Sequence, residues 1–308
     1  MSHSRRALHF VLKIGNLKKN VEFFRDRLGM KVLRHEVFDE GCEAACNGPY
    51  SNKWSKTMIG FGAEDDHFVL ELTYNYSVGS YKLGNDLQYI KMSLKEELYE
   101  RVRNVELTEE QSPKKVKSDQ ESLSVLSPDG YKFLILKQST SDKSKQDLTE
   151  VCLSCVSLEK SINYWVDLLK MVRRGDKDET KSALLSYASD QASLRLKQID
   201  ETMDHKSAYG RIAFSCPSNQ LKDIQKAAED AGHKILTPFV SLDTPGKATV
   251  QVVILADPDG HEICFVGDEG FRELSQVDPK ANELIENSIA EDNSDEWFKK
   301  KNLSKKEE

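Results

Sequence analysis

Long hydrophobic runs are missing from this 308-residue chain. A membrane-spanning helix needs roughly 20 consecutive apolar residues. Because no stretch approaches that length, we expect neither an integral membrane protein nor a membrane partner. The opening residues, Met1 to Arg6, include two arginines but no apolar segment and no small-residue cleavage pattern. We therefore expect no secretion signal, which favours a cytoplasmic protein.

Positive charge is also in short supply. Lys and Arg number 44 against 51 Asp and Glu, which gives a formal net charge of −7. Binding to nucleic-acid phosphates needs a clustered cationic face, so we expect no nucleic-acid partner. A hydrophobic share of 38% and a charged share of 31% fit a globular protein, and the length suits two domains of ordinary size.

Cysteine is scarce, with six in the chain. Cys152 and Cys155 match a C-x-x-C spacing, but their segment alternates like a strand, in which residues three apart point to opposite faces. Cys42 and Cys46 have no second pair at zinc-finger spacing. We therefore predict that the six cysteines are reduced thiols, as in cytosolic proteins.

The chain does contain an internal repeat. Leu12 to Met30, LKIGNLKKNVEFFRDRLGM, aligns with Leu153 to Met171, LSCVSLEKSINYWVDLLKM, at a constant offset in which leucines, a lysine, an aspartate and the final methionines coincide. A second echo is Pro-Asp-Gly, which ends at Gly130 in one half and at Gly260 in the other, each before an apolar run. Pro-Asp-Gly favours a tight turn, so each copy predicts a hairpin.

Hydrophobic periodicity predicts strand, helix and strands in succession. Helices are expected over residues 18–28, 95–104, 158–169 and 219–231, and strands over 7–14, 31–38, 55–61, 68–76, 87–93, near 123 and over 131–136. The fold class is therefore α+β, with tandem βαβββ modules in two similar halves whose sheets curve into half-barrels. The order in which the modules pair is left open by the sequence.

The polar segment Ser139 to Gln146 lacks apolar periodicity and is the best linker. It separates an N-terminal domain, residues 5–138, from a C-terminal domain, residues 147–268. Residues 269–308 are expected to form a helix near Pro279 to Ala290 that packs on the core, followed by a solvated, disordered tail from Lys299.

Strand alternation brings a histidine and a glutamate to one face. The apolar positions of the strand at residues 7–14 leave His9 and Lys13 on the other face, and those of the strand at 68–76 leave Glu71 and Asn75 there. These residues could simply face water. If the sheet curls into a cleft, however, His9 and Glu71 are ordinary ligands for a divalent ion such as Zn, Ni, Co or Mn.

The run Glu71-Leu-Thr-Tyr-Asn-Tyr resembles the ELT-x-N-aromatic motif of the glyoxalase I family, in the vicinal-oxygen-chelate superfamily. The resemblance to glyoxalase domain-containing proteins extends from about Arg5 to about Phe298 and includes Ser241 to Glu269. It implies that Glu71 is a metal ligand, that His9 is the first ligand, and that Asn75 contacts glutathione. We also take Glu71 as the candidate catalytic residue, although the family pattern takes its base from the last strand of another module. It also implies a small-molecule substrate such as a glutathione adduct.

The family pattern takes two further ligands from another module. The corresponding positions of the first half hold Leu87 and Leu134, which cannot ligate, and those of the second half hold Arg211 and Cys264. Cys264 could complete a His9, Glu71, Cys264 site as a thiolate if the first and last modules meet.

Cations on the same faces are candidates for substrate binding. Arg211 would repel a metal but could hold an anionic substrate, and Lys13 could do the same. A second cleft would have Glu150 and Arg195 where the first has His9 and Glu71. We interpret that second cleft as a degenerate site.

Two functions remain open. One is a lactoylglutathione-lyase-type carbon–sulfur lyase acting on the thiol adduct of a methylglyoxal-type α-oxoaldehyde. The other is a non-catalytic module that binds a small metabolite or an unidentified protein partner. A dioxygenase or hydrolase would need a complete ligand set and ranks last. A monomer can supply paired modules by itself. The family resemblance adds the mitochondrion to the cytosol as a candidate compartment.

Overall fold

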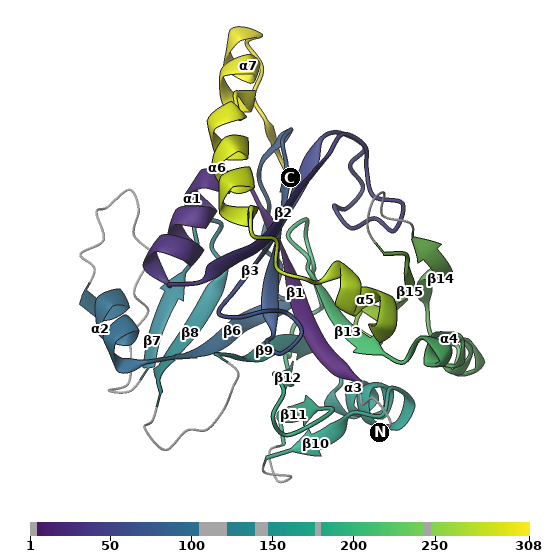
Figure 1. Ribbon diagram of the computed structural model, residues 1–308. Coiled ribbons are helices and arrows are strands. Elements are labelled where there is room, and N and C mark those ends of the chain that lie inside the picture. The colour runs from purple at the N-terminus through teal and green to yellow at the C-terminus, as the bar shows by residue number, and fades with distance from the viewer. Residues whose placement is uncertain (1–4, 105–121, 139–146, 176–179, 243–247) are drawn as a thin grey trace.

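The computed structural model describes residues 5–104, 122–138, 147–175, 180–242 and 248–308 (Figure 1). Within these residues no helix is both long and apolar enough to span a membrane. The expected modules are present, and most of their boundaries fall within one or two residues of the predicted ones.

Each half of the chain contains two modules. The first module comprises β1 (Arg6–Ile14), α1 (Leu17–Val21), η1 (Glu22–Arg27), β2 (Lys31–Phe38), β3 (Trp54–Gly60) and β4 (Val69–Asn75), followed by the short β5 (Val78–Ser80). The second comprises β6 (Leu87–Leu94), α2 (Glu96–Asn104), β7 (Ser122–Leu126) and β8 (Lys132–Lys137).

The second half follows the same plan. The third module comprises β9 (Leu148–Cys155), α3 (Leu158–Ile162), η2 (Asn163–Leu168), β10 (Val172–Arg174), β11 (Ser182–Ser186) and β12 (Ser193–Gln198). The fourth comprises β13 (Arg211–Cys216), η3 (Ser218–Gln220), α4 (Leu221–Asp230), β14 (Ile235–Leu242), β15 (Val250–Ala256) and β16 (Glu262–Gly267).

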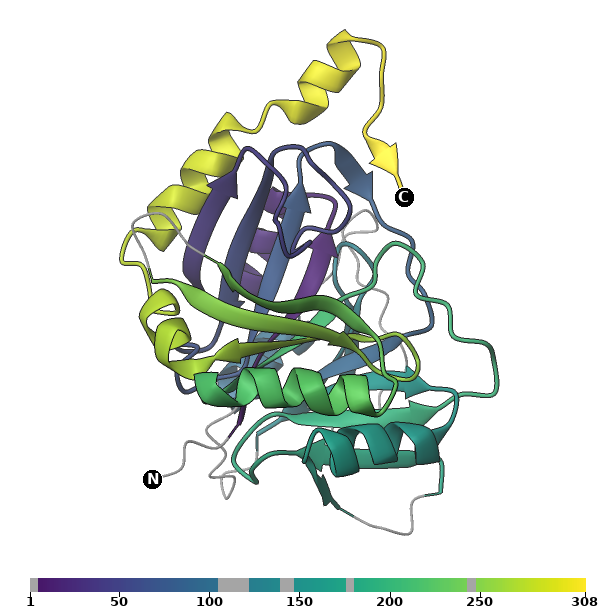
Figure 2. The ribbon, with the colours of Figure 1, turned by 90° about the vertical axis from the view of Figure 1, so that its right-hand side faces the viewer.

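Both large sheets draw strands from both halves of the chain. The eight-stranded sheet has the order β14-β15-β16-β13-β1-β4-β3-β2, so it joins the fourth module to the first through the antiparallel β1–β13 pair. The seven-stranded sheet has the order β10-β11-β12-β9-β6-β8-β7 and joins the third module to the second. Figure 2 shows β14 and β15 running across the strands of the first module, so the eight-stranded sheet curls.

The repeat is preserved in three-dimensional detail. Asn16 and Ser157 each cap a helix by accepting a hydrogen bond from the backbone N–H three residues later. Both helices continue into a π-helical turn, η1 or η2. Each then ends before a residue with positive φ, Gly29 in one half and Lys170 in the other. The two halves therefore share backbone geometry as well as sequence.

Both Pro-Asp-Gly segments form the predicted hairpin turns, and each turn holds the neighbouring module. Asp129 accepts hydrogen bonds from Gly15 N at 2.7 Å and Asn20 Nδ2 at 2.6 Å. Asp259 accepts the corresponding bonds from Val156 N and Ser161 Oγ, both at 3.0 Å. Within each half, the Pro-Asp-Gly turn of one module thus accepts hydrogen bonds from the other module. The donors are a backbone N–H just before that module's helix and a side chain of the helix itself.

Aromatic side chains join the modules of each half. Phe24 of η1 packs edge-on against Phe133 of β8, with ring centroids 5.4 Å apart. Trp165 of η2, which aligns with Phe24, makes an edge-on contact with Phe214 of β13 at 6.0 Å. All four side chains are fully buried. Apolar packing therefore connects the modules within each half, and strand pairing connects the halves.

The C-terminal segment returns to the first module. After α5 (Asp268–Leu274), α6 (Ala281–Glu291) packs on β2 and buries Ala281 and Ile285, as the sequence predicts. Beyond α7 (Ser294–Lys300), the tail that we expected to be solvated and disordered is exposed but ordered in part: it forms β17 (Lys306–Glu307), which pairs in parallel with β5. The free backbone edge of β5 gives those residues hydrogen-bond partners that periodicity cannot predict.

One cysteine prediction is wrong. Cys42 and Cys46 are joined by a disulfide. A turn closed by a hydrogen bond from Ala45 N to Cys42 O brings the two Cα atoms within 5.4 Å, a separation that a disulfide can bridge. The remaining cysteines, Cys152, Cys155, Cys216 and Cys264, are free thiols.

Candidate functional site

The candidate site lies on one face of the eight-stranded sheet, where the first and fourth modules meet. In the strand register His9 lies opposite Ala213, which in turn lies opposite Cys264, and Val11 pairs with Glu71. Paired residues of neighbouring strands share a face. The structure therefore places His9, Glu71 and Cys264 on one surface, through the module pairing that the sequence leaves open.

His9 is held between two carboxylates. Its Nδ1 lies 2.6 Å from Glu64 Oε1, and its Nε2 lies 3.6 Å from Glu71 Oε2. A carboxylate can only accept, so Nδ1 carries a proton in this contact, and Nε2 faces Glu71. Metal-binding histidines commonly show this arrangement, with one ring nitrogen anchored and the other free to ligate.

Glu64, in the loop between β3 and β4, is the anchor of the site. Its side chain is fully buried, and Arg34 Nη2 donates to Glu64 Oε2 at 2.7 Å. Burial alone raises the pKa of Glu64, but His9 and Arg34 outweigh it and hold that pKa below its usual value. Glu64 therefore stays ionised and fixes the orientation of His9.

Glu71 has few protein partners for a buried carboxylate. It is 7% exposed, and Thr73 Oγ1 donates to its Oε1 at 3.4 Å. Close by in the register, Arg34 lies opposite Met58, which lies opposite Glu71. Among the described residues Arg34 Nη1 is buried and has no hydrogen-bond partner. A buried carboxylate and an orphaned donor on one face suit a ligand that completes both.

The Cys264 thiol is not held in position for metal binding in the way that the His9 ring is. Burial raises its pKa to about 11; Glu71 and Glu262 add to the rise, while Arg211 opposes it. In the described part of the chain, the ligand atoms of Cys264, His9 and Glu71 do not come within 4.8 Å of one another as a group. Two of the predicted ligands, His9 and Glu71, thus lie close together, and Cys264 would need to move toward them to join a shared ion.

Arg211 lies on the predicted face, but its guanidinium group already has partners within the protein. Its Nη2 lies 2.7 Å from Glu262 Oε2, and its Nη1 and Nη2 donate to the carbonyls of Ala44 and Ala45 at 3.1 and 3.3 Å. The guanidinium therefore joins the fourth module to the loop that contains the disulfide. An anionic ligand would have to compete with these partners.

Lys13 lies further along the same face and is 2% exposed. Its Nζ donates to Ser207 O at 3.1 Å and lies 3.1 Å from the centroid of the Tyr209 ring. Burial lowers the pKa of Lys13 to about 7; Glu262 opposes this change and Arg211 adds to it. A lysine that titrates near neutral pH can bind an anion or transfer a proton.

Asn75 is also on this face, but its amide is engaged within the protein. Nδ2 donates to Asn47 O and to Tyr81 Oη, and Oδ1 accepts from Asn47 Nδ2 at 3.0 Å. These bonds fix the loop after β2 over the end of the cleft that contains Lys13.

The second cleft carries a neutralised cluster. Glu150 accepts hydrogen bonds from Lys91 Nζ at 2.7 Å, Tyr89 Oη at 2.7 Å and Arg195 Nε at 2.9 Å. Both oxygens of this carboxylate already accept from a cationic donor, which leaves little for a metal. The arrangement agrees with a degenerate site.

Sequence reasoning missed Glu64 and Arg34. Glu64 lies in a loop where no periodicity assigns a face, and it acts through His9. An acidic run after a strand is usually read as a solvated loop. The one available signal is that a partly buried histidine such as His9 needs a partner for its second nitrogen.

Comparisons with known proteins agree with this architecture. Residues 6–135 match the family model of the glyoxalase/bleomycin resistance protein/dioxygenase superfamily. Residues 157–274 match that of the glyoxalase domain-containing protein 4-like C-terminal domain. Both halves therefore carry recognisable glyoxalase-type sequence.

Two relatives extend the match to nearly the whole chain. Glyoxalase domain-containing protein 4 of Rattus norvegicus is 54% identical over 98% of this chain and 98% of its own length. Glyoxalase 1 of Caenorhabditis elegans is 45% identical over 95% of this chain and 99% of its own. The crystal structure of glyoxalase I from Zea mays aligns with a TM-score of 0.66 at 23% identity, over 88% of this chain and 95% of that one, and shows the same fold.

Proposed function

The chain belongs to the glyoxalase domain-containing protein 4 family, and from that membership we propose that it is a glyoxalase-I-like lyase. Its substrate would be the thiol adduct of an α-oxoaldehyde, such as a glutathione adduct of methylglyoxal. The nematode relative named Glyoxalase 1 supports the proposal, as does a 27% identical relative named lactoylglutathione lyase in Oryza sativa. The observation that carries it is the clamp of Glu64 on His9, which turns Nε2 toward Glu71.

His9 and Glu71 would hold a divalent ion of the Zn, Ni, Co or Mn group, with Cys264 as a third ligand. An imidazole nitrogen, a carboxylate oxygen and a thiolate form a donor set that suits such borderline metals. The anchored His9 ring fits a ligand role. A bound ion would stabilise the negative charge that develops on adjacent substrate oxygens.

Glu71 would act as the proton carrier. Its carboxylate would accept the proton from the carbon that bears the sulfur and return it to the neighbouring carbonyl carbon. The hydroxyl proton passes to the neighbouring oxygen through solvent, so a hemithioacetal becomes a 2-hydroxy thioester without net oxidation. Lys13 and Arg211 would hold anionic groups of the substrate. Asn75 would act through the loop that it fixes, because its amide already binds Asn47 and Tyr81.

A non-catalytic binding module is the second candidate. The observation that favours it is the internal pairing of the groups that should meet a substrate: Arg211 binds Glu262, and the amide of Asn75 is satisfied. The same pairing would leave a cleft that holds a metabolite or a protein segment without chemistry.

The test compares wild type with Glu71→Gln, Glu64→Gln and the control Glu22→Gln, a residue of η1 whose side chain is 44% exposed. Each protein is reconstituted with Zn, Ni, Co or Mn, analysed for bound metal, and assayed for lactoylglutathione formation from methylglyoxal and glutathione. We expect Glu71→Gln to lower kcat by about 10²–10⁴-fold, because general acid–base catalysis contributes that much. Glu64→Gln should weaken metal binding about 10–100-fold through loss of the His9 anchor.

Glu22→Gln should leave both quantities unchanged. Metal in the cleft without thioester formation would favour the binding module. If no metal in the wild type depends on Glu71, the lyase proposal fails.

A further inference from the structure

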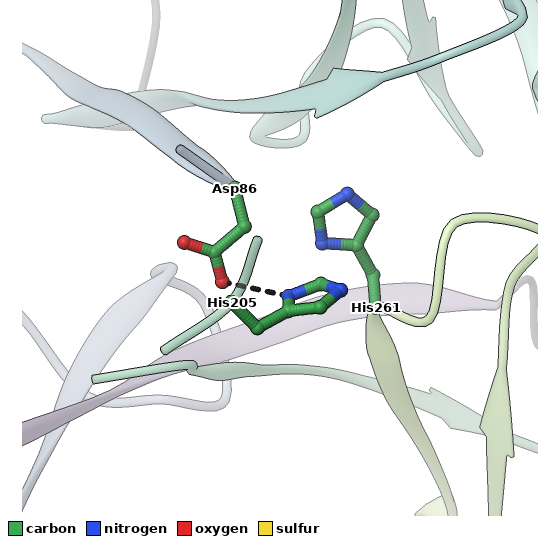
Figure 3. Close-up of side chains that lie close together, drawn as sticks. All are labelled: Asp86, His205 and His261. Carbon is green, nitrogen blue, oxygen red and sulfur yellow. Dashed lines mark hydrogen bonds and ion pairs between the residues drawn. The ribbon is translucent and has the colours of Figure 1, made fainter. Parts of the chain in front are cut away.

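Three ligand-type side chains converge away from the cleft, at the junction of the two sheets. Figure 3 shows Asp86, His205 and His261 approaching one another from separate segments. Asp86 immediately precedes β6 of the seven-stranded sheet, and His261 immediately precedes β16 of the eight-stranded sheet. His205 lies on the connection between β12 and β13. None of the three belongs to the site proposed above.

The spacing of these side chains suits a metal ion. One ligand atom from each residue lies within 4.8 Å of the other two, and His205 Nδ1 is 2.9 Å from Asp86 Oδ2. Zinc bonds to histidine nitrogen and carboxylate oxygen of about 2.0–2.2 Å place tetrahedral ligands roughly 3.3–3.6 Å apart. Side-chain adjustments of about 1 Å would therefore complete such a site.

Both histidines are anchored on their outer nitrogens. His205 Nε2 donates to Asp259 O at 2.9 Å, and His261 Nε2 donates to Ser154 O at 2.7 Å. A carbonyl accepts only, so Nε2 carries a proton in each ring. Nδ1 of His205 also carries a proton, because it donates to Asp86 Oδ2, whereas Nδ1 of His261 is left for a ligand. Anchoring through a backbone carbonyl is the usual outer shell of a metal-binding histidine.

His261 adds an independent sign that a ligand belongs here. The residue is 5% exposed, and within the described part of the chain no hydrogen bond reaches its Nδ1. In Figure 3 that nitrogen faces the space shared with Asp86 and His205. A ring nitrogen without a hydrogen bond, on a side chain that is almost fully buried, is available to a ligand.

The backbone holds the cluster close. Asp86 Oδ1 accepts from Leu87 N at 2.9 Å, which leaves Oδ2 facing the histidines. Gly260 has φ +91°, and a Cβ built there would lie 3.1 Å from His205 Nε2. Glycine therefore allows the turn before His261 to approach the His205 ring.

We propose that Asp86, His205 and His261 form a structural site for a divalent transition-metal ion of the zinc class, separate from the cleft. The ligands would be Nδ1 of each histidine and Oδ2 of Asp86, with water in the fourth position. On binding, His205 Nδ1 releases its proton to solvent and exchanges its hydrogen bond to Asp86 for the metal bond. The ion would join both sheets and the connection between β12 and β13.

The experiment uses the full chain in a Glu71→Gln background, so that metal bound in the cleft does not contribute. The protein is stripped with a chelator and titrated with Zn²⁺ by calorimetry and with Co²⁺ by visible spectroscopy, and melting temperature is recorded with and without Zn²⁺. We expect about one ion per chain and a rise in melting temperature with Zn²⁺. Adding His261→Gln should weaken binding at least about 10-fold and remove the thermal shift.

A matched control is His233→Gln in the same background, because His233 packs on Tyr164 outside both sites. It should bind as the background does. His205→Gln provides a second test if His261→Gln fails to fold, which circular dichroism reports. The proposal is overturned if the background binds no Zn²⁺, or if removal of either histidine leaves the stoichiometry and affinity unchanged. These outcomes do not depend on lyase activity.

Discussion

At the scale of single residues, Lys13 is a buried cation in the cleft that lowers the stability of the fold. It is almost fully buried with its cationic end against Tyr209 and a single carbonyl acceptor. Desolvation brings its pKa to about 7. The ammonium form is thus disfavoured in the folded protein and favoured in the unfolded chain. Such a residue is retained more readily for binding or proton transfer than for stability.

The pKa shift of Lys13 gives a prediction with a definite sign. Between about pH 7 and pH 10.5 the unfolded chain holds the proton that the folded protein has lost, so this group's contribution to stability rises with pH. Below pH 7 its destabilisation is fully present. Lys13→Met should therefore raise the free energy of unfolding by roughly 2–4 kcal/mol at pH 6, with the gain declining toward pH 10.

Urea unfolding at pH 6, 8 and 10 measures this gain. Lys18→Met is the matched control, because the Lys18 side chain is 68% exposed and its removal should change stability by less than about 0.5 kcal/mol at each pH. A Lys13→Met variant that is destabilised equally at all three pH values would contradict the assignment of Lys13 as a disfavoured buried cation.

At the scale of elements, the two Pro-Asp-Gly turns act as clamps between modules. Asp129 binds Gly15 N and Asn20, and Asp259 binds Val156 N and Ser161. Each aspartate satisfies donors at the start of a helix that belongs to the other module of its half. The turn residues thus have a second role besides reversing the chain, and this role recurs with the repeat.

Loss of either aspartate should have similar effects on stability. We expect Asp129→Ala and Asp259→Ala each to lower the free energy of unfolding by about 1–3 kcal/mol, because each leaves a backbone N–H without its acceptor. Asp230→Ala, on the exposed end of α4, should change it by less than about 0.5 kcal/mol. Chemical denaturation of the three variants measures the difference. Equal effects of all three substitutions would argue against a clamp.

At the scale of the whole molecule, the halves of the chain share both sheets. β1 pairs with β13, and β6 pairs with β9, so each half in isolation would expose the long edges that the other half covers. The prediction that residues 5–138 and 147–268 are separate domains is compatible with the aromatic packing inside each half. Whether either half is stable as a monomer depends instead on the strand pairs that join the two halves.

Separating the halves tests this interdependence. We expect residues 1–138 and 147–308, expressed alone, to self-associate or precipitate, because exposed edge strands pair with other chains. Expressed together, they should co-purify as a 1:1 complex with metal-binding behaviour like that of the intact chain. Sedimentation and size-exclusion chromatography measure both results. A soluble, monomeric single half would show that the cross-half sheets are not required for folding.

The sequence by itself determined the modules and the face on which His9 and Glu71 lie. Both conclusions depend on local geometry, since alternation along a strand is set by the backbone and a repeat at constant offset specifies equal folds. Cys264 could be included only conditionally, because its distance from His9 depends on which modules pair.

Only the tertiary structure decided which modules pair, and therefore which residues share the site. Hydrogen bonds between strands separated by some two hundred residues select the register that joins the first module to the fourth, and local patterns carry no information about such contacts. The same applies to Glu64, which lies in a loop and reaches His9 through space, and to the Cys42–Cys46 disulfide, which depends on one turn. It applies equally to the cluster of Asp86, His205 and His261, whose members meet only when both sheets are assembled.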